Sequence, residues 1–330
     1  MKIKHTKSPC CGAIVVHFGY RRRQCTICKK TWRIRKKKRG RKQERRSSNF
    51  VLQYFRHEIP SMLGISKRTG ISRRTLELQL RHSRDFLLDH TKWPEVPDTG
   101  DLICVGDGFV LQLRKRWYTC HLILVRDTNS EDAVILPPVI LEGTETQASW
   151  RKAFETIPQF VASRIRALVC DGHRGLVNHA KHESWIIQRC HFHLLSAIGG
   201  RRSRSRKSRH KAEGDRVYAL VKAVLTTTKE DSIPNLLHQV DDEALNTSSP
   251  ELRKYLRGFI NCWEDFRSYL YHPKLHLPTT NNTAESLAGC LTELLHRARG
   301  FSSLKAVEKW ICAFIKYKKT IKCRGNHQPN

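Results

Sequence analysis

The sequence lacks any long apolar run and is poor in acidic residues. No stretch of its 330 residues approaches the ~20 consecutive apolar residues that span a bilayer, and its basic N-terminus lacks the apolar segment of an export signal. Only 30 Asp and Glu balance 61 Lys and Arg, which leaves a formal charge of +31. Because such a surplus repels itself, it favours a polyanionic partner, and nucleic acid is the leading one.

These absences also predict where the protein works. Without a membrane span or an export signal, we expect a cytoplasmic, nucleoid-associated protein. The 12 cysteines could indicate disulfides, but the chain is long and several of them stand inside apolar runs. Free thiols and metal ligands in a reducing compartment are therefore the expectation.

The charge and the apolar pattern of the sequence change along its length, which predicts three domains. Residues 1–46 read as a basic arm, and residues 47–98 carry apolar positions at helical intervals. Residues 99–330 begin with several short apolar runs separated by turns and continue as a helix, a further strand and more helices. Strands are expected at 102–105, 109–113, 117–125, 134–141 and 165–170, with a helix near 147–154. This alternation predicts a mixed α/β core.

The N-terminal cysteines indicate a zinc knuckle. Cys25 and Cys28 have the two-residue spacing that lets both thiolates of one turn reach a tetrahedral ion, and Cys10 and Cys11 precede them. So short a segment cannot build an apolar core, so a metal would have to stabilise it. We predict Cys10, Cys11, Cys25 and Cys28 as Zn²⁺ ligands. The alternative is a set of reduced thiols in a flexible basic tail.

One ligand of this set is ambiguous. Ser8 stands where the usual ribbon pattern has its first cysteine, and adjacent cysteines ligate one ion only with awkward geometry. Either Cys10, His5 or His17 could therefore complete the set with the other cysteines.

Residues 62–76 have a pattern that is typical of a helix-turn-helix. A short helix is expected to end at Gly70, and Ser72 can cap a second helix whose first turn presents Arg73 and Arg74. Such a helix could enter a major groove with its early residues facing base edges. The alternative is an ordinary helical hairpin with a solvated face.

Three carboxylates are the candidates for catalysis. Asp107 and Asp171 each follow an apolar strand and precede a glycine, so we expect both at one edge of the sheet. Glu285, near the start of a predicted helix, could supply a third acid, with Glu293 as its nearest rival. Such an oxygen-lined pocket suits one or two Mg²⁺ ions, which could stabilise the attacking and leaving oxygens of a phosphodiester.

Four segments together resemble the motif set of DDE transposases of bacterial insertion sequences. They are Val105–Phe109, Val169–Gly175, Gln188–His193 and Thr280–Ser286. The resemblance is closest to the Mutator-like branch, whose mark is a Cys-x-x-His motif between the second Asp and the Glu. It covers about 100–320 well, and the N-terminal part in general plan.

The resemblance implies a fold, a reaction and its partners. The fold would be a ribonuclease-H-like (retroviral-integrase-like) catalytic core with a helical insertion at about 194–275. Asp107, Asp171 and Glu285 would be the catalytic triad and would bind Mg²⁺ (or Mn²⁺). The family cuts DNA at terminal inverted repeats and joins the freed 3′-hydroxyl to target DNA, commonly as a homo-oligomer in a synaptic complex.

Further residues of these motifs are expected near the chemistry. Cys190 and His193 would be the Cys-x-x-His pair. We assign them a packing or positioning role rather than a second zinc site, because two ligands lack the four that a closed structural site requires. His173 could contact phosphate or face water. Thr280, Asn281 or Asn282 could cap the helix that carries Glu285, and Asn282 is the one that we expect in a positioning role at the site.

The basic segments are expected to bind DNA phosphates, although a solvated face is the usual role of any one such residue. The predicted DNA-binding residues are Arg35, Lys36, Lys37, Lys38, Arg39, Arg73, Arg74, Arg297 and Arg299. An active transposase is the favoured interpretation, because all three acids are present. A catalytically silent, sequence-specific DNA-binding regulator derived from a transposase is the alternative, and a plain nuclease is a third reading.

Overall fold

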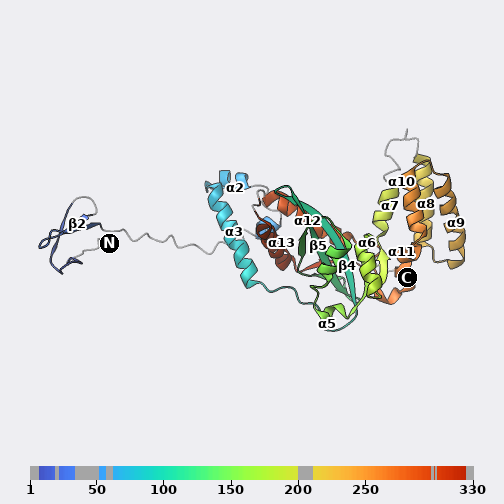
Figure 1. Cartoon of the computed structure of the whole chain (residues 1–330), viewed down its shortest axis with the longest axis horizontal. Helices are drawn as coiled ribbons and strands as arrows, with labels where there is room; N and C mark the ends of the chain where they lie inside the picture. The colour runs from blue at the N-terminus through green and yellow to red at the C-terminus, as the bar shows by residue number, and fades with distance from the viewer. Residues whose placement is uncertain are drawn as a thin grey trace. The chain divides into compact units, whose positions relative to one another are not determined.

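The structure is a computed structural model, which describes residues 7–18, 22–33, 52–56, 62–199, 211–298, 301 and 303–324 (Figure 1). Its contacts divide the chain into two compact units, Met1–Arg46 and Ser47–Asn330. Within the described ranges no helix has both the length and the apolar character needed to cross a bilayer.

The first unit is a small antiparallel sheet. Its strands β1 (Val15–His17), β2 (Arg22–Cys25) and β3 (Thr31–Arg33) pair in that order. Ile14 is 71% exposed and Phe18 is 47% exposed, whereas Cys25 is fully buried. The described part of this unit therefore buries sulfur rather than an apolar core, and its stability has to come from another source.

Two helices begin the second unit. Helix α2 (Met62–Thr69) ends before Gly70, whose φ of +64° is the left-handed conformation that glycine adopts without strain. Helix α3 (Arg73–His90) follows, and the side chain of Ser72 caps it by accepting a hydrogen bond from the backbone N–H of Thr75. The two helices expected from the sequence are present, with Gly70 and Ser72 at the expected boundary, whereas their role as a DNA-binding helix-turn-helix stays a prediction.

Helix α3 and residues 52–56 pack on the rest of the second unit. Helix α3 lies against α13 (Leu304–Lys318), and the rings of Tyr54 and Phe55 contact Trp310. Residues 47–98 and 99–330 thus share one core here. Their division into two domains remains a prediction.

The second unit is built around a mixed sheet of seven strands. The order is β10-β6-β5-β4-β8-β9, with β7 paired to β5. Neighbours from β10 to β4 are antiparallel, whereas β4, β8 and β9 are parallel. The strands are β4 (Leu102–Leu113), β5 (Arg116–Asp127), β6 (Asp132–Ile135), β7 (Val139–Glu142), β8 (Ile165–Cys170), β9 (Ile186–Arg189) and β10 (Thr320–Lys322).

The division into strands differs from expectation in two places. The single strand expected at 134–141 is divided into β6 and β7. We predicted separate strands at 102–105 and 109–113, but β4 runs through both without a break. Gly106, Asp107 and Gly108 stay paired with β5, because β5 continues alongside them as an antiparallel partner. The prediction that Asp107 ends a strand is therefore wrong.

Helices cover both faces of this sheet (Figure 1). Alternate side chains of β4 enter different cores, as the strand period requires. Ile103 packs in the core with α12 (Asn282–Ala298) and α13, whereas Cys104 packs in the core with α4 (Gln147–Phe154) and α6 (Arg174–His182). The short helix α5 (Gln159–Ala162) leads into β8. The mixed α/β class expected from the sequence is confirmed.

A helical segment lies between β9 and α12 and has a third core of its own. Its helices are α7 (His191–Gly199), α8 (Lys211–Thr226), α9 (Ile233–Asn246), α10 (Pro250–Ile260) and α11 (Trp263–Tyr271), with short turns η1 (Glu230–Ser232) and η2 (Pro273–Leu275). They stand together at the right of Figure 1. The helical character predicted for 194–275 is present in the residues that the structure describes.

Candidate active site

Asp107 and Asp171 are brought together by strand register. Val105 of β4 is the partner of Val169 of β8, and the two strands are parallel. Each aspartate stands two residues beyond its valine, so the two lie side by side, with Asp107 inside β4 and Asp171 directly after β8. The pairing of β4 with β8 ends at Val105, which opens the sheet beside Asp107 even though β4 itself continues.

The electrostatics of Asp107 indicate a crowded acidic site. Burial raises the pKa of Asp107 to about 7, and the carboxylate of Asp171 is the next cause. Glu285 and Glu145 raise this pKa as well, while a hydrogen bond of 3.0 Å from the backbone N–H of Gly108 opposes the shift. Because neighbouring carboxylates disfavour one another's charged form, a bound divalent cation would relieve the repulsion.

Asp171 is held by the start of helix α6. Its Oδ1 accepts a hydrogen bond of 2.7 Å from the backbone N–H of His173. The His173 Nδ1 accepts one from the backbone N–H of Gly175, so this histidine caps α6. Contact of His173 with phosphate stays a prediction. Capping of α6 is a structural role that the sequence analysis did not predict.

Glu285 lies in the first turn of α12, a helix that runs along β4. Its Oε1 is 3.3 Å from Nδ1 of His193. Cys190, His193 and Glu285 each offer a ligand atom within 4.8 Å of the other two. Among the described residues a second such set exists in the N-terminal unit, and neither set includes Asp107 or Asp171. Glu285 therefore influences the aspartates but lies with the Cys-x-x-His pair.

The Cys-x-x-His pair is fixed from two sides. The backbone N–H of Cys190 donates to the Cys170 carbonyl at the end of β8, and its Sγ accepts from the backbone N–H of Asn281 at 3.4 Å. Asn281 is fully buried, whereas Asn282, the residue that we predicted, is exposed at the start of α12. The asparagine that reaches this site is thus the neighbour of the expected one.

Glu145 is a fourth acid at the site, and the sequence reasoning missed it. Its Oε1 accepts a hydrogen bond from Nε1 of Trp150 and lies 3.4 Å from Nδ1 of His173. A side-chain carbon added at Gly108 would come within 3.3 Å of the Glu145 carboxylate. Burial raises the pKa of Glu145. The only signal in the sequence is weak: Glu145 directly precedes Thr146, the cap of α4.

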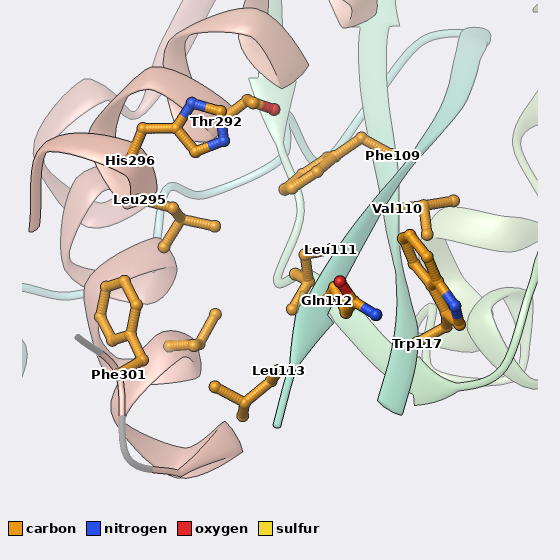
Figure 2. Close-up of a pocket in the computed structure, with 11 residues that line it drawn as sticks. Phe109, Val110, Leu111, Gln112, Leu113, Trp117, Thr292, Leu295, His296 and Phe301 are labelled. Carbon is orange, nitrogen blue, oxygen red and sulfur yellow. The ribbon is translucent and has the colours of Figure 1, made fainter. Parts of the chain in front are cut away.

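A cavity of about 310 Å³ lies along the elements that carry the acids (Figure 2). Phe109 lies on the same side of β4 as Asp107, because the two residues are two positions apart in the strand. Its ring points toward Thr292 and His296 of α12 in Figure 2. The remaining lining is mostly apolar and comes from Val110, Leu111, Gln112, Leu113, Trp117, Leu295, Phe301 and Val307.

The N-terminal unit gathers Cys10, Cys11, Cys25 and Cys28, with all four sulfur atoms within 4.8 Å of one another. The Sγ atoms of Cys11 and Cys25 are 3.1 Å apart, and those of Cys10 and Cys28 are 3.2 Å apart. Zn–S bonds of about 2.3 Å in a tetrahedron separate sulfurs by roughly 3.8 Å, so the set fits a zinc ion after a small expansion.

The other residues around this cluster have different partners. His17 contacts the guanidinium of Arg23, and His5 lies outside the described residues. Ser8 is buried, with its Oγ 3.5 Å from Sγ of Cys11. A hydrogen bond from Ser8 is the main cause that lowers the pKa of Cys25 to about 5. In the same cluster a hydrogen bond from the Lys30 backbone lowers the pKa of Cys28, but its contact with Cys10 and burial outweigh this bond and raise the pKa to about 11. Only part of the cluster thus favours the thiolate that a metal requires. Both adjacent cysteines reach the cluster, despite the awkward geometry that we expected of such a pair.

The predicted DNA-binding residues fall into three groups. Arg73 and Arg74 are exposed in the first turn of α3, and Nε of Arg73 is 2.8 Å from Oε1 of Glu77. Arg297 instead packs its guanidinium over the ring of Tyr54 and donates to the Tyr54 carbonyl. Arg35, Lys36, Lys37, Lys38, Arg39 and Arg299 lie outside the described residues.

Comparison with known proteins gives one family. A family model described as "Transposase, Mutator family" matches residues 129–319, which is more than half of the chain. The matched region includes Asp171, Cys190, His193 and Glu285, whereas Asp107 precedes it. No curated protein matches the chain significantly.

Proposed function

The chain belongs to the Mutator family of transposases, and from this premise we propose that it binds transposon terminal inverted repeats and catalyses DNA cleavage and strand transfer. The observation that carries the proposal is the register that sets Asp107 and Asp171 side by side, where burial and mutual repulsion raise the pKa of Asp107 to about 7. Clusters of acids with a raised pKa are typical of catalytic sites.

The sheet topology supports a ribonuclease-H-like core. Strands β6, β5 and β4 form an antiparallel meander, and β8 and β9 extend it in parallel on the other side of β4. Asp107 lies in β4 and Asp171 directly follows β8, the strand next to β4 in the sheet. The helical segment precedes the helix that carries Glu285.

The donor set suits Mg²⁺ or Mn²⁺, because carboxylate oxygens are the ligands that these hard cations prefer. Asp107, Asp171 and Glu285 would hold the metal, and Glu145 would stand beside them as a further acid. Bound metal would supply Lewis-acid stabilisation of the attacking and leaving oxygens of the phosphodiester. Within the chain, the His173 amide orients Asp171 and the Gly108 amide orients Asp107.

Glu285 has to approach the aspartates for this role. In the structure its carboxylate lies with Cys190 and His193, and an interaction of 3.3 Å links it to the imidazole. We assign His193 and Cys190 to positioning this carboxylate. Closure around DNA would then bring Glu285 toward Asp107, whose pKa it already raises.

DNA recognition is proposed for two elements. The N-terminal unit would fold around Zn²⁺ held by Cys10, Cys11, Cys25 and Cys28, because its described strands bury little apolar surface. Helices α2 and α3 would form a helix-turn-helix that presents Arg73 and Arg74. Two copies or more would bring both transposon ends together in a synaptic complex.

A second candidate is a catalytically silent DNA-binding regulator derived from a transposase. One observation favours it: the three acids of the triad do not form a converged ligand set in this structure. The two candidates predict opposite results with metal.

The test uses the full-length chain, Mg²⁺ and a duplex that carries the inverted repeat bracketing the gene. Cleavage at the repeat that disappears in Asp171→Asn supports the transposase. The matched control is Asp241→Asn, because Asp241 is an exposed acid on α9, a helix that packs in a different core from the aspartates. Tight binding without metal and without cleavage in the wild-type chain would instead support the regulator.

A further inference from the structure

Cys190, His193 and Glu285 bring three different ligand chemistries to one point. The thiol sulfur, the imidazole Nδ1 and the carboxylate Oε1 lie within 4.8 Å of one another, and the nitrogen and oxygen are 3.3 Å apart. The three residues come from the end of β9, from α7 and from α12. Their meeting therefore depends on the tertiary fold, so the spacing of Cys190 and His193 alone could not predict it.

Two of these atoms are buried without a hydrogen bond. Nδ1 of His193 and Oε1 of Glu285 face each other at 3.3 Å, but neither makes a hydrogen bond with any described residue, although the side chains as a whole are 42% and 28% exposed. Asn281 beside Cys190 is fully buried, and both polar atoms of its side chain also lack such a partner in that part of the chain. Because buried polar atoms are normally paired, this group indicates an additional occupant.

The spacing suits a tetrahedral zinc ion. Zn–N and Zn–O bonds of roughly 2.0–2.1 Å place a nitrogen and an oxygen ligand roughly 3.3 Å apart, which is the separation between His193 and Glu285. A thiolate and an imidazole select zinc over magnesium. Three protein ligands with partial exposure leave a fourth position for water, as in zinc sites that exchange ligands.

We propose that Cys190, His193 and Glu285 form a second Zn²⁺ site with one open position, and that zinc bound there inhibits the enzyme by holding Glu285 away from Asp107 and Asp171. The inhibitory part rests on the proposed transposase function, whereas the binding part does not. This differs from the sequence-based expectation, which rejected zinc because only two ligands were visible. Glu285 is the third.

The Glu285 carboxylate would serve as a ligand for both Zn²⁺ and Mg²⁺. Zinc binding releases the thiol proton of Cys190 and engages Oε1 of Glu285. The same carboxylate is the proposed third ligand for Mg²⁺. Zinc and magnesium therefore compete for Glu285, and the Cys-x-x-His pair sets the outcome.

Binding is tested with Co²⁺, whose bond to a thiolate absorbs in the near ultraviolet. The full chain carries Cys10→Ser, Cys11→Ser, Cys25→Ser and Cys28→Ser, which removes all four thiols of the N-terminal cluster. We expect this protein to bind Co²⁺ with the absorption of a single thiolate, and we expect the further change Cys190→Ser to abolish that absorption. Adding His193→Gln instead should weaken Co²⁺ binding by at least ~10-fold, since ligand loss costs no less than loss of a second-shell partner.

The matched control is Cys290→Ser in the same background, because Cys290 is an exposed thiol on the same helix as Glu285. It should leave the absorption unchanged. The binding proposal is overturned if the background protein shows no cobalt–thiolate absorption, or if the absorption survives Cys190→Ser.

Inhibition is tested on the wild-type chain already loaded with one equivalent of zinc. Further Zn²⁺ should lower Mg²⁺-dependent cleavage by ~10-fold or more, and Cys190→Ser should reduce this effect to within ~2-fold of its own zinc-free rate. Equal inhibition of both proteins would overturn the competition. If no protein cleaves DNA, the proposed function has failed, but the cobalt spectra still decide whether the site exists.

Discussion

Asp107 and Asp171 occupy equivalent positions on adjacent parallel strands, each two residues beyond the paired Val105 and Val169. This relationship places two carboxylates side by side, where burial and then Asp171 raise the pKa of Asp107 to about 7. Below that pH Asp107 holds a proton that a cation must displace. The metal affinity of the site should therefore rise with pH through the neutral range.

The first prediction is a pH-dependent effect of Mg²⁺ on thermal stability. At about pH 8 Mg²⁺ should raise the unfolding temperature by several degrees, and at about pH 6 by much less, because the protonated acid binds metal poorly. Differential scanning calorimetry measures both values. In Asp107→Asn the difference between the two pH values should be small. An equal Mg²⁺ effect at both pH values in the wild-type chain would contradict the assignment.

The raised pKa of Asp107 also predicts how the free energy of unfolding depends on pH in the absence of metal. A raised acid pKa stabilises the fold below the ordinary pKa of about 4, and this contribution is lost as pH rises through about 7. Asp107→Asn should therefore unfold less readily than the wild-type chain at about pH 8, by on the order of 2 kcal/mol, and show little difference at about pH 4. Urea unfolding at the two pH values measures this difference.

A substitution of Glu145 tests whether this acid contributes to catalysis. Glu145→Gln should lower Mg²⁺-dependent cleavage by ~10- to 100-fold, as loss of an outer-shell partner does at metal sites. Because Glu145 also raises the pKa of Asp107, the pH midpoint of activity should move downward in this variant. The control is Glu142→Gln, since Glu142 is exposed at the end of β7 and pairs with Arg116. Unchanged activity and midpoint in Glu145→Gln would remove Glu145 from the site.

The sequence could predict the parts of the site that local patterns set. Apolar runs give the strand that leads to Asp171, and a two-residue cysteine spacing gives half of the N-terminal cluster. It could not predict that β4 continues through Asp107, because an antiparallel partner on β5 holds the Gly106–Gly108 segment extended. Glu145 and the approach of Glu285 to His193 depend on packing between elements far apart in the chain, for which no local pattern exists.

The position of Ser8 makes the zinc cluster testable by rescue. In a Cys190→Ser background, Cys10→Ser should weaken Co²⁺ binding by ~10-fold or more, because one of four thiolates is lost. Adding Ser8→Cys should restore it, since the Ser8 side chain lies 3.5 Å from Sγ of Cys11 and is buried against the cluster. Cobalt–thiolate absorption measures both steps. Cys312→Ser, at a half-buried thiol on α13, is the control and should change nothing.

Intact Co²⁺ binding in Cys10→Ser would show that Cys10 is not a ligand. The set would then have to be completed by a residue other than the four cysteines. Loss of binding in both variants would instead place Ser8 too far from the ion to replace Cys10.

Helix α3 supports a prediction about DNA recognition. Arg73 is engaged by Glu77 in the same helix, whereas Arg74 is exposed with no ion pair among the described residues. Arg74→Ala should weaken binding to the transposon end by about 1–3 kcal/mol if Arg74 reads a base edge, with little change for an unrelated duplex. If it contacts phosphate, both duplexes should lose affinity and the salt dependence should fall by about one unit.

Fluorescence anisotropy with labelled duplexes separates these outcomes. Arg81→Ala is the matched control, because Arg81 is an exposed arginine on the same helix, two turns beyond the end that would enter the groove. Its affinity should stay within ~2-fold of the wild-type value. If Arg81→Ala weakens binding as much as Arg74→Ala does, the contribution comes from the charge of the whole helix. The first turn of α3 would then have no special role, and the helix-turn-helix assignment would lose its support.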